Sequence, residues 1–224
     1  MHPGPDVHRD AVEPGNGSGA RHGEWTGRPV RAGGRATSRH GEYSASMRMI
    51  DGSDRIEWTI DVGGLSRDDL IARLDARGIH RNPFAETLLA DAVFDDAAHE
   101  TITVVERSVS DLGFPDGATL PDVFGAAARH GLGLCPPVTA PYLRLATLDQ
   151  ATAPDSILST GRAPTGSLNV AAPVPRADHD YPKGFHLRVI DGVPWLRGYR
   201  CDDEHVLSPD DRFAFRAPAG GPNS

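Results

Sequence analysis

One predicted β-hairpin gathers most of the side chains that could recognise a ligand. Its strands, residues 185–190 and 193–199, flank Asp191-Gly192, a pair that is typical of a two-residue hairpin turn. A turn of this length fixes the register, so alternate residues share one outer face. The residues predicted on that face are His186, Arg188, Ile190, Val193, Trp195, Arg197 and Tyr199.

This outer face combines guanidinium groups with aromatic rings, which suits a small anionic or carbonyl-bearing ligand. The arginines would donate hydrogen bonds, while Trp195 and Tyr199 would provide stacking surfaces. Two other arrangements fit the same pattern. Arg188 could stack on Trp195 across the strands, or helices could cover the face while acidic partners neutralise its arginines.

A second set of residues carries side chains that bind metal ions. Its members are His179, Asp180, His186, Asp203 and His205. Three such ligands around an open position would suit a small metal-assisted hydrolase. However, the chain has no HExxH or CxxC spacing, and these acidic residues flank turns, which is typical of solvated positions. The sequence therefore predicts no metal, no cofactor and no catalytic residue.

Cys135 is the remaining candidate for nucleophilic chemistry. It follows a predicted helix end, whereas thiolates are favoured at helix N-termini. Leu134 and the two prolines that follow Cys135 indicate a small buried core residue. The chain also lacks the GxSxG motif of a serine nucleophile.

An α+β fold would position these residues. Strands are predicted at 56–62 and 101–109 from alternating and β-branched residues. Ser66, Asn82 and Thr119 are predicted to cap three helices. Further strands are predicted at 142–146, at 167–172, in the hairpin and around Phe213 and Phe215. We expect three helices packed on a mostly antiparallel sheet in a single domain, residues 56–218.

Residues 1–46 differ from the rest of the chain. They are rich in Gly, Pro, Arg and His and hold few large apolar side chains, so we predict that they are disordered. Met47 and Met49 directly precede the first predicted strand, which leaves two hypotheses. Translation begins at one of these methionines and residues 1–46 lie upstream of the true start, or these residues are a genuine flexible tail.

Composition excludes several classes of protein. The 224 residues carry a formal net charge of −8, which argues against nucleic-acid binding, because nonspecific affinity depends on neutralising phosphates. No apolar run is long enough for a membrane span or a secretory signal, and no GxxxxGK[ST] motif occurs. We expect a cytoplasmic protein with reduced cysteines that binds neither nucleic acid nor membranes.

Residues 108–150 contain the runs LGFPDGAT, GLGLCP and LRLATLDQ. These runs resemble a family of uncharacterised bacterial proteins that share LGFxxGAT, GLxLCP and LRLxxxxQ segments. The resemblance implies no activity, since the motif residues are mostly Gly, Leu and Pro. Arg144 and Gln150 are its polar exceptions and could contact a ligand or partner; alternatively, Arg144 pairs with an acid such as Asp149 or Asp111.

These observations predict a non-enzymatic cytosolic binding or protein-interaction module, whose partner is a small anionic ligand or an unidentified protein. The predicted binding residues are Arg144, Gln150, His186, Arg188, Trp195, Arg197 and Tyr199. The rival hypothesis is the metal-assisted hydrolase, and a third is a structural subunit without a site. Convergence of three ligands from the 179–205 segment would favour the hydrolase.

Overall fold

The computed structural model describes residues 45–49, 56–95, 97–152, 166–178 and 180–218. Internal contacts divide the chain into two units, Met1–His40 and Gly41–Ser224, and all described residues belong to the second. Residues 1–44 of the predicted tail therefore lie outside the described residues. The last two residues of that tail, Ala45 and Ser46, belong to the first strand.

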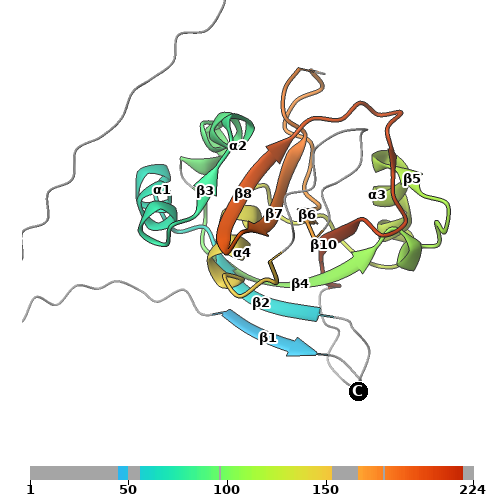
Figure 1. The fold of residues 1–224 in the computed structure, drawn as a ribbon, viewed down its shortest axis with the longest axis horizontal. Coiled ribbons are helices and arrows are strands. Elements are labelled where there is room, and N and C mark those ends of the chain that lie inside the picture. Colours follow the sequence, from blue (N-terminus) through green and yellow to red (C-terminus); the bar gives the residue numbers. More distant parts are fainter. Residues whose placement is uncertain (1–44, 50–55, 96, 153–165, 179, 219–224) are drawn as a thin grey trace, which may run out of the picture. The chain divides into compact units, whose positions relative to one another are not determined.

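An eight-stranded sheet is the frame of the described region (Figure 1). In sheet order its strands are β1 (Ala45–Met49), β2 (Ile56–Val62), β4 (Glu100–Ser108), β10 (Arg212–Arg216), β6 (Leu168–Val170), β7 (Gly184–Ile190), β8 (Val193–Tyr199) and β3 (His80–Arg81). Neighbours are antiparallel except β10 with β6 and β8 with β3. A separate two-stranded sheet pairs β5 (Ala118–Thr119) with β9 (Val206–Leu207). The predicted α+β class with a mostly antiparallel sheet is confirmed.

The described residues form four α-helices, one more than the sequence predicts. They are α1 (Arg67–Ala76), α2 (Pro83–Leu89), α3 (Leu120–Arg129) and α4 (Thr139–Ala146), with short 3-10 helices η1 (Ala92–Phe94) and η2 (Ser110–Leu112). The side chains of Ser66, Asn82 and Thr119 accept hydrogen bonds from first-turn backbone N–H groups, so all three predicted caps are confirmed. In this part of the chain no helix has the length and apolar composition of a membrane span.

The additional helix, α4, replaces the strand predicted at 142–146. Six consecutive residues from Thr139 to Arg144 are buried, so α4 lacks the polar stripe that identifies a surface helix in a sequence. Pro141 lies in the first turn, where its missing N–H costs no helical hydrogen bond. The apolar character of this segment therefore reflects a helix enclosed by the core.

The sheet curls around α4, because α4 contacts β2, β7 and β8, which lie far apart in the strand order. The enclosed face shares one hydrophobic core with α1, α2 and α4, which includes Ile60 and Leu187. A second core, which includes Phe213 and Phe215, lies between α3 and the opposite face of β4 and β10. Figure 1 shows α1 and α2 near β3 and β8, and α3 near the far end of β4.

Candidate functional site

The predicted hairpin is confirmed in both its turn and its register. Strands β7 and β8 pair Ile190 with Val193, and they place Arg188 opposite Trp195 and His186 opposite Arg197. Asp191 and Gly192 both adopt positive φ angles, 49° and 78°, which are the backbone conformations of a type I′ turn.

Burial divides the predicted outer face of the hairpin into two parts. His186 is 5% exposed and Arg188 is 0% exposed, whereas Trp195, Arg197 and Tyr199 are half-buried. The guanidinium of Arg197, and not that of Arg188, lies over the Trp195 ring, at 5.3 Å from its centroid. The accessible part of this face therefore consists of β8 residues and the adjoining strand β3.

His186 is held in its neutral form. Its pKa is lowered to about 3, mainly by burial of the imidazole and in part by the nearby guanidinium groups of Arg197 and Arg188. Its Nε2 atom makes no hydrogen bond to any described residue. A neutral, enclosed imidazole at this position is unsuited to act as a general base near neutral pH.

Arg144 and Gln150, the two polar residues of the LRLATLDQ segment, are in direct contact in the structure. Nη1 of Arg144 donates to Oε1 of Gln150 at 2.9 Å and to the backbone carbonyl of Arg188 at 3.2 Å. Nη2 of Arg144 donates to the carbonyl of Thr147 at the end of α4. Nε2 of Gln150 donates to the carbonyls of Gly166 and Leu187, at 3.0 and 3.4 Å.

This network joins α4 to the backbone of β7 through neutral acceptors. Arg144 is 0% exposed, and burial lowers its pKa to about 10, an effect that Asp149 opposes. Two predicted binding residues are thus occupied by contacts within the protein. Both side chains donate to backbone carbonyls of β7, Arg144 to Arg188 and Gln150 to Leu187.

The residues proposed as metal ligands do not gather in the described region. No group of three His, Cys, Asp or Glu side chains there is arranged to hold a metal ion. Asp180 pairs with Arg200 at 3.2 Å, and His179 lies outside the described residues. Cys135 is buried, as predicted, and burial raises its pKa to about 12.

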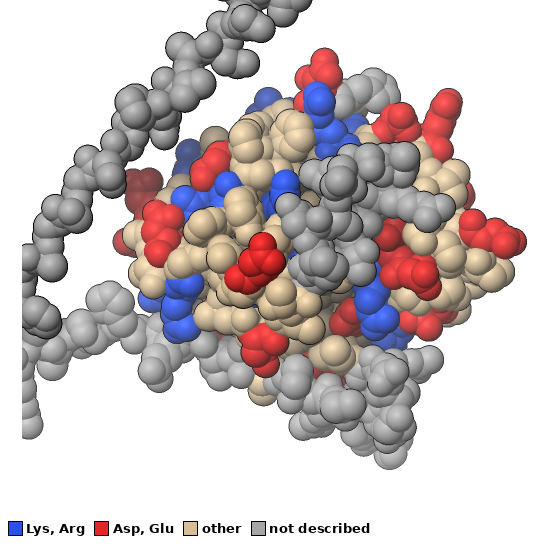
Figure 2. Space-filling view, in the orientation of Figure 1, with Lys and Arg blue, Asp and Glu red and all other residues tan. Residues whose placement is uncertain are grey.

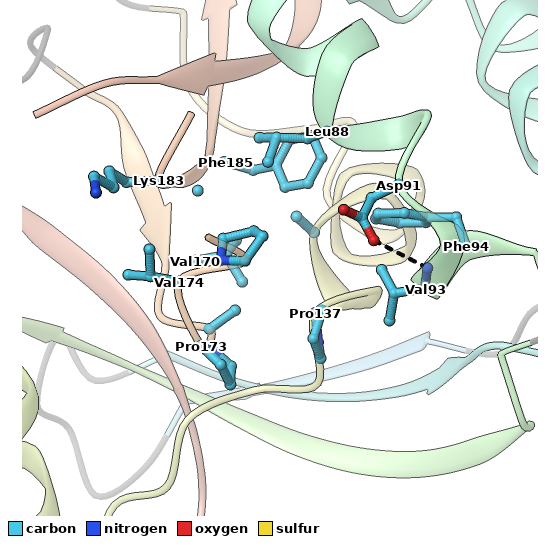
Figure 3. Close-up of a pocket in the computed structure, with 14 residues that line it drawn as sticks. Leu88, Asp91, Val93, Phe94, Pro137, Val170, Pro173, Val174, Lys183 and Phe185 are labelled. Carbon is cyan, nitrogen blue, oxygen red and sulfur yellow. Dashed lines mark hydrogen bonds between the residues drawn. The ribbon is translucent and has the colours of Figure 1, made fainter. Parts of the chain in front are cut away.

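A cavity of about 280 Å³ lies on the inner side of the hairpin (Figure 3). Four separate segments of the chain contribute to its walls. The lining residues are Leu88, Asp91, Val93, Phe94, Pro137, Ala140, Val170, Ala172, Pro173, Val174, Pro175, Lys183, Gly184 and Phe185. Twelve of these fourteen are apolar or glycine, and the two charged residues, Asp91 and Lys183, lie at opposite ends of the lining in Figure 3.

Asp91 is fully engaged by its neighbours. Its Oδ1 accepts from the backbone N–H of Val93 at 3.2 Å, and its Oδ2 accepts from Arg176 at 3.3 Å and from the hydroxyl of Tyr181 at 3.4 Å. The bond from Val93 lowers the pKa of Asp91, and the guanidinium of Arg176 adds to that effect. The guanidinium of Arg176 also lies 4.3 Å from the centroid of the Tyr181 ring. Asp91 is therefore an ionised, compensated carboxylate that ties the segment after β6 to η1.

Lys183 is the only lysine in the chain, and it is 5% exposed. Its Nζ donates to the backbone carbonyl of Asp178 at 3.4 Å. Its backbone N–H bonds to the carbonyl of Tyr199, which fixes Lys183 beside the end of β8. Lys183 therefore lines the cavity directly before β7, while Figure 3 shows its side-chain nitrogen pointing away from the other lining residues.

Sequence reasoning did not identify this cavity. Its residues come from α2, η1, the start of α4, the segment after β6 and the start of β7, and only the fold brings them together. The isolation of Lys183 in an arginine-rich chain is the one signal in the sequence that points to it. On the molecular surface, acidic and basic side chains are interspersed over the face shown in Figure 2, so charge does not single out a site there.

Comparisons with protein families, with curated proteins and with solved structures find no match to this chain. The geometry of the described residues therefore carries the functional argument. Two arrangements on the hairpin are relevant to it. One is the inner cavity that reaches Phe185, and the other is the half-buried group of Trp195 and Arg197 on the outer face.

Proposed function

We propose that this protein is a non-enzymatic binding module whose inner cavity takes a small, mostly apolar ligand. The observation that carries the proposal is the cavity itself, since it is lined mostly by apolar side chains and has one charged residue at each end. Binding sites for small molecules share this composition, with a few polar groups that orient the ligand.

The size of the cavity limits the ligand. A volume of about 280 Å³ is at the lower end of ligand pockets, which run from roughly 300 to 1,000 Å³. At about 30 Å³ for each water-sized group, it holds about nine such groups. A short aliphatic chain or a single substituted ring fits this limit, whereas a nucleotide does not.

The walls supply most of the favourable free energy for such a ligand. Four buried apolar side chains line the cavity, those of Leu88, Phe94, Val170 and Phe185, and the rings of Phe94 and Phe185 meet edge-on at a centroid distance of 6.2 Å. A ligand that covers apolar surface gains about 25 cal/mol for each Å² that is removed from water. The rim residue Val174 is 39% exposed, which makes it the position where a ligand would enter or be blocked.

The proposal is tested by titrating the protein with hexanoate and following its methyl groups by NMR. We expect saturable shifts of the Leu88 and Val170 methyl signals. Val174→Trp should weaken binding about tenfold or more, because the ring occupies the rim of the cavity. The matched control is Val206→Trp, an exposed valine in β9 that does not line the cavity. Equal affinities for the two variants would contradict the proposal.

A second candidate uses the accessible part of the outer face. Arg197 lies over Trp195 at 5.3 Å, and the His80 ring meets Trp195 edge-on at a centroid distance of 5.0 Å. A guanidinium on an indole favours a planar anion that can stack and accept hydrogen bonds. Trimesate, whose charge keeps it out of an apolar cavity, is the probe. Arg197→Ala should abolish its binding, and the exposed Arg129→Ala should not; equal binding by both would refute this candidate.

A further inference from the structure

We infer that residues 172–177 form a strap that closes the inner cavity and opens to admit its ligand, an inference that rests on the proposed function. The strap follows β6, and its residues 172–175 all line the cavity. Residues 173–177 are nevertheless exposed to solvent. This part of the cavity wall is therefore a single segment of chain with the cavity on one side and water on the other.

The two ends of the strap are fixed by hydrogen bonds. Ala171, which precedes it, donates to a backbone carbonyl of β10 at 3.0 Å and accepts from the N–H of Cys135 at 2.7 Å. The carbonyl of Asp178, which follows it, accepts from Nζ of the buried Lys183 at 3.4 Å. Between these points, no backbone group of the strap bonds to another described residue. Exposed segments with few hydrogen bonds are the ones that open at the lowest free-energy cost.

Side chains hold the middle of the strap in place. Nη2 of Arg176 donates to Oδ2 of Asp91 at 3.3 Å, and its guanidinium lies 4.3 Å from the centroid of the Tyr181 ring. The Tyr181 hydroxyl bonds to the same carboxylate oxygen at 3.4 Å and to the carbonyl of Thr87 in α2 at 3.3 Å. Asp91, Arg176 and Tyr181 form the latch of the strap. Figure 3 shows Pro173 across the lining from Asp91, so the latch joins two sides of the cavity.

Burial indicates that a ligand needs the strap to open. Val170 and Phe185, which line the cavity, are 2% and 5% exposed, so a ligand reaches them only when part of the wall moves. The latch permits this movement, because the side chain of Arg176 is 58% exposed. A single ion pair with such exposure shifts an equilibrium by up to about fivefold. The latch therefore favours the closed strap without locking it.

The experiment measures opening in the absence of a ligand, by the rate at which iodoacetamide labels a thiol in the cavity wall. Val170→Cys provides this thiol, and its smaller side chain fits the space that the valine leaves. Cys135 is the internal control, because it is buried in the same core but does not line the cavity. Peptide mass spectrometry measures the labelling rate of each thiol separately.

The latch is weakened by Arg176→Gln, alone and combined with Tyr181→Phe, at positions outside the cavity lining. We expect labelling at position 170 to become about threefold faster in the first variant and about tenfold faster in the second, since each lost contact favours the open strap. The labelling rate of Cys135 should stay the same. Arg129→Gln, at an exposed position in α3, removes the same charge elsewhere and should change neither rate.

The outcomes separate the strap from the proposed function. Equal labelling at position 170 with and without the latch would overturn the strap, and so would an equal acceleration at Cys135, since the whole core would then have loosened. Hexanoate should slow labelling at position 170; if it does not, while the latch variants still accelerate labelling, the proposed function fails and the strap stands. Should Val170→Cys not fold, Leu88→Cys in α2 provides the thiol, and the same comparisons decide.

Discussion

Arg144 is a fully buried guanidinium that bonds to neutral oxygen atoms. Its planar group reaches three acceptors at once, namely the side chain of Gln150, the carbonyl of Arg188 and the end of α4. A lysine ammonium is a compact charge and cannot span acceptors that are arranged in this way. We conclude that Arg144 holds α4 against β7 because its planar, forked guanidinium group can reach all three acceptors.

Replacement of Arg144 tests this role. We expect Arg144→Met to lower the free energy of unfolding by roughly 2 to 4 kcal/mol, because several buried acceptors lose their donor. Arg144→Lys should be destabilised to a similar degree, since the charge alone does not restore the fork. Urea denaturation measures both, with the exposed Arg129→Met as control. If Arg144→Lys matched the natural protein, the argument from fork geometry would be wrong.

The buried imidazole of His186 should make stability depend on pH. Its pKa is about 3 in the folded protein and about 6.5 when unfolded. The unfolded chain therefore binds a proton that the folded chain does not. The stability of the folded protein that comes from this difference in pKa is complete above about pH 6.5 and is lost as the pH falls toward 3.

Between pH 7 and pH 5, this single group should cost the natural protein roughly 1 to 2 kcal/mol of stability. His186→Gln should show a correspondingly smaller loss over the same range, as measured by urea denaturation at the two pH values. His130, which is exposed at the end of α3, provides the control variant His130→Gln. Parallel pH profiles for the natural protein and His186→Gln would show that the imidazole is not held neutral.

At the level of elements, Asn82 links a helix to a strand edge. Its Oδ1 accepts from Ala85 N in α2 and from Gly198 N in β8, and its Nδ2 donates to the Gly198 carbonyl. The side chain thus caps α2 and pairs with β8 as a strand residue would. Gly198 permits this approach, because a Cβ there would lie 2.5 Å from the backbone carbon of Phe84.

We expect Asn82→Ala to cost roughly 2 to 4 kcal/mol, from the lost cap and two unsatisfied strand groups. Asn82→Asp keeps both acceptor functions but loses the donor, so its loss of stability should be intermediate. Chemical denaturation of the two variants gives the comparison. A loss below about 0.5 kcal/mol in Asn82→Ala would mean that water replaces these bonds.

The sequence predicted helix starts and the hairpin turn correctly, because each depends on residues that lie close together in the chain. The caps at Ser66, Asn82 and Thr119 and the turn at Asp191-Gly192 depend on atoms a few residues apart. The helix α4 was predicted as a strand because complete burial removes the polar stripe that distinguishes the two. Its identity depends on the sheet that surrounds it.

At the level of the whole molecule, the strand order could not be predicted. Strand β10, the last described strand in the sequence, lies between β4 and β6, so it joins two parts of the sheet that precede it in the chain. The inner cavity depends on this assembly of distant segments, since its walls come from α2, α4, β6 and β7. The sequence predicted the hairpin but gave no indication of which of its faces borders the cavity.

The edge strand β1 contains Met47 and Met49, the two methionines at which translation could begin according to one of the hypotheses above. It pairs with β2 over five positions, from Ala45 with Ile60 to Met49 with Ile56. A chain that starts at Met49 lacks most of these pairs, so it should be less stable than one that starts at Gly41 by roughly 2 to 4 kcal/mol. Urea midpoints compare the two chains. Equal midpoints would show that β1 adds nothing to the sheet.

The central claim, that the inner cavity binds a small apolar ligand, is tested most directly by the position of a bound probe. The measurement is the set of intermolecular nuclear Overhauser effects between hexanoate and the methyl and aromatic protons of the protein. We predict contacts with Leu88, Val170 and Phe185, which line the cavity from different elements. Contacts confined to other residues, or no contacts when the protein is saturated with the probe, would contradict the claim.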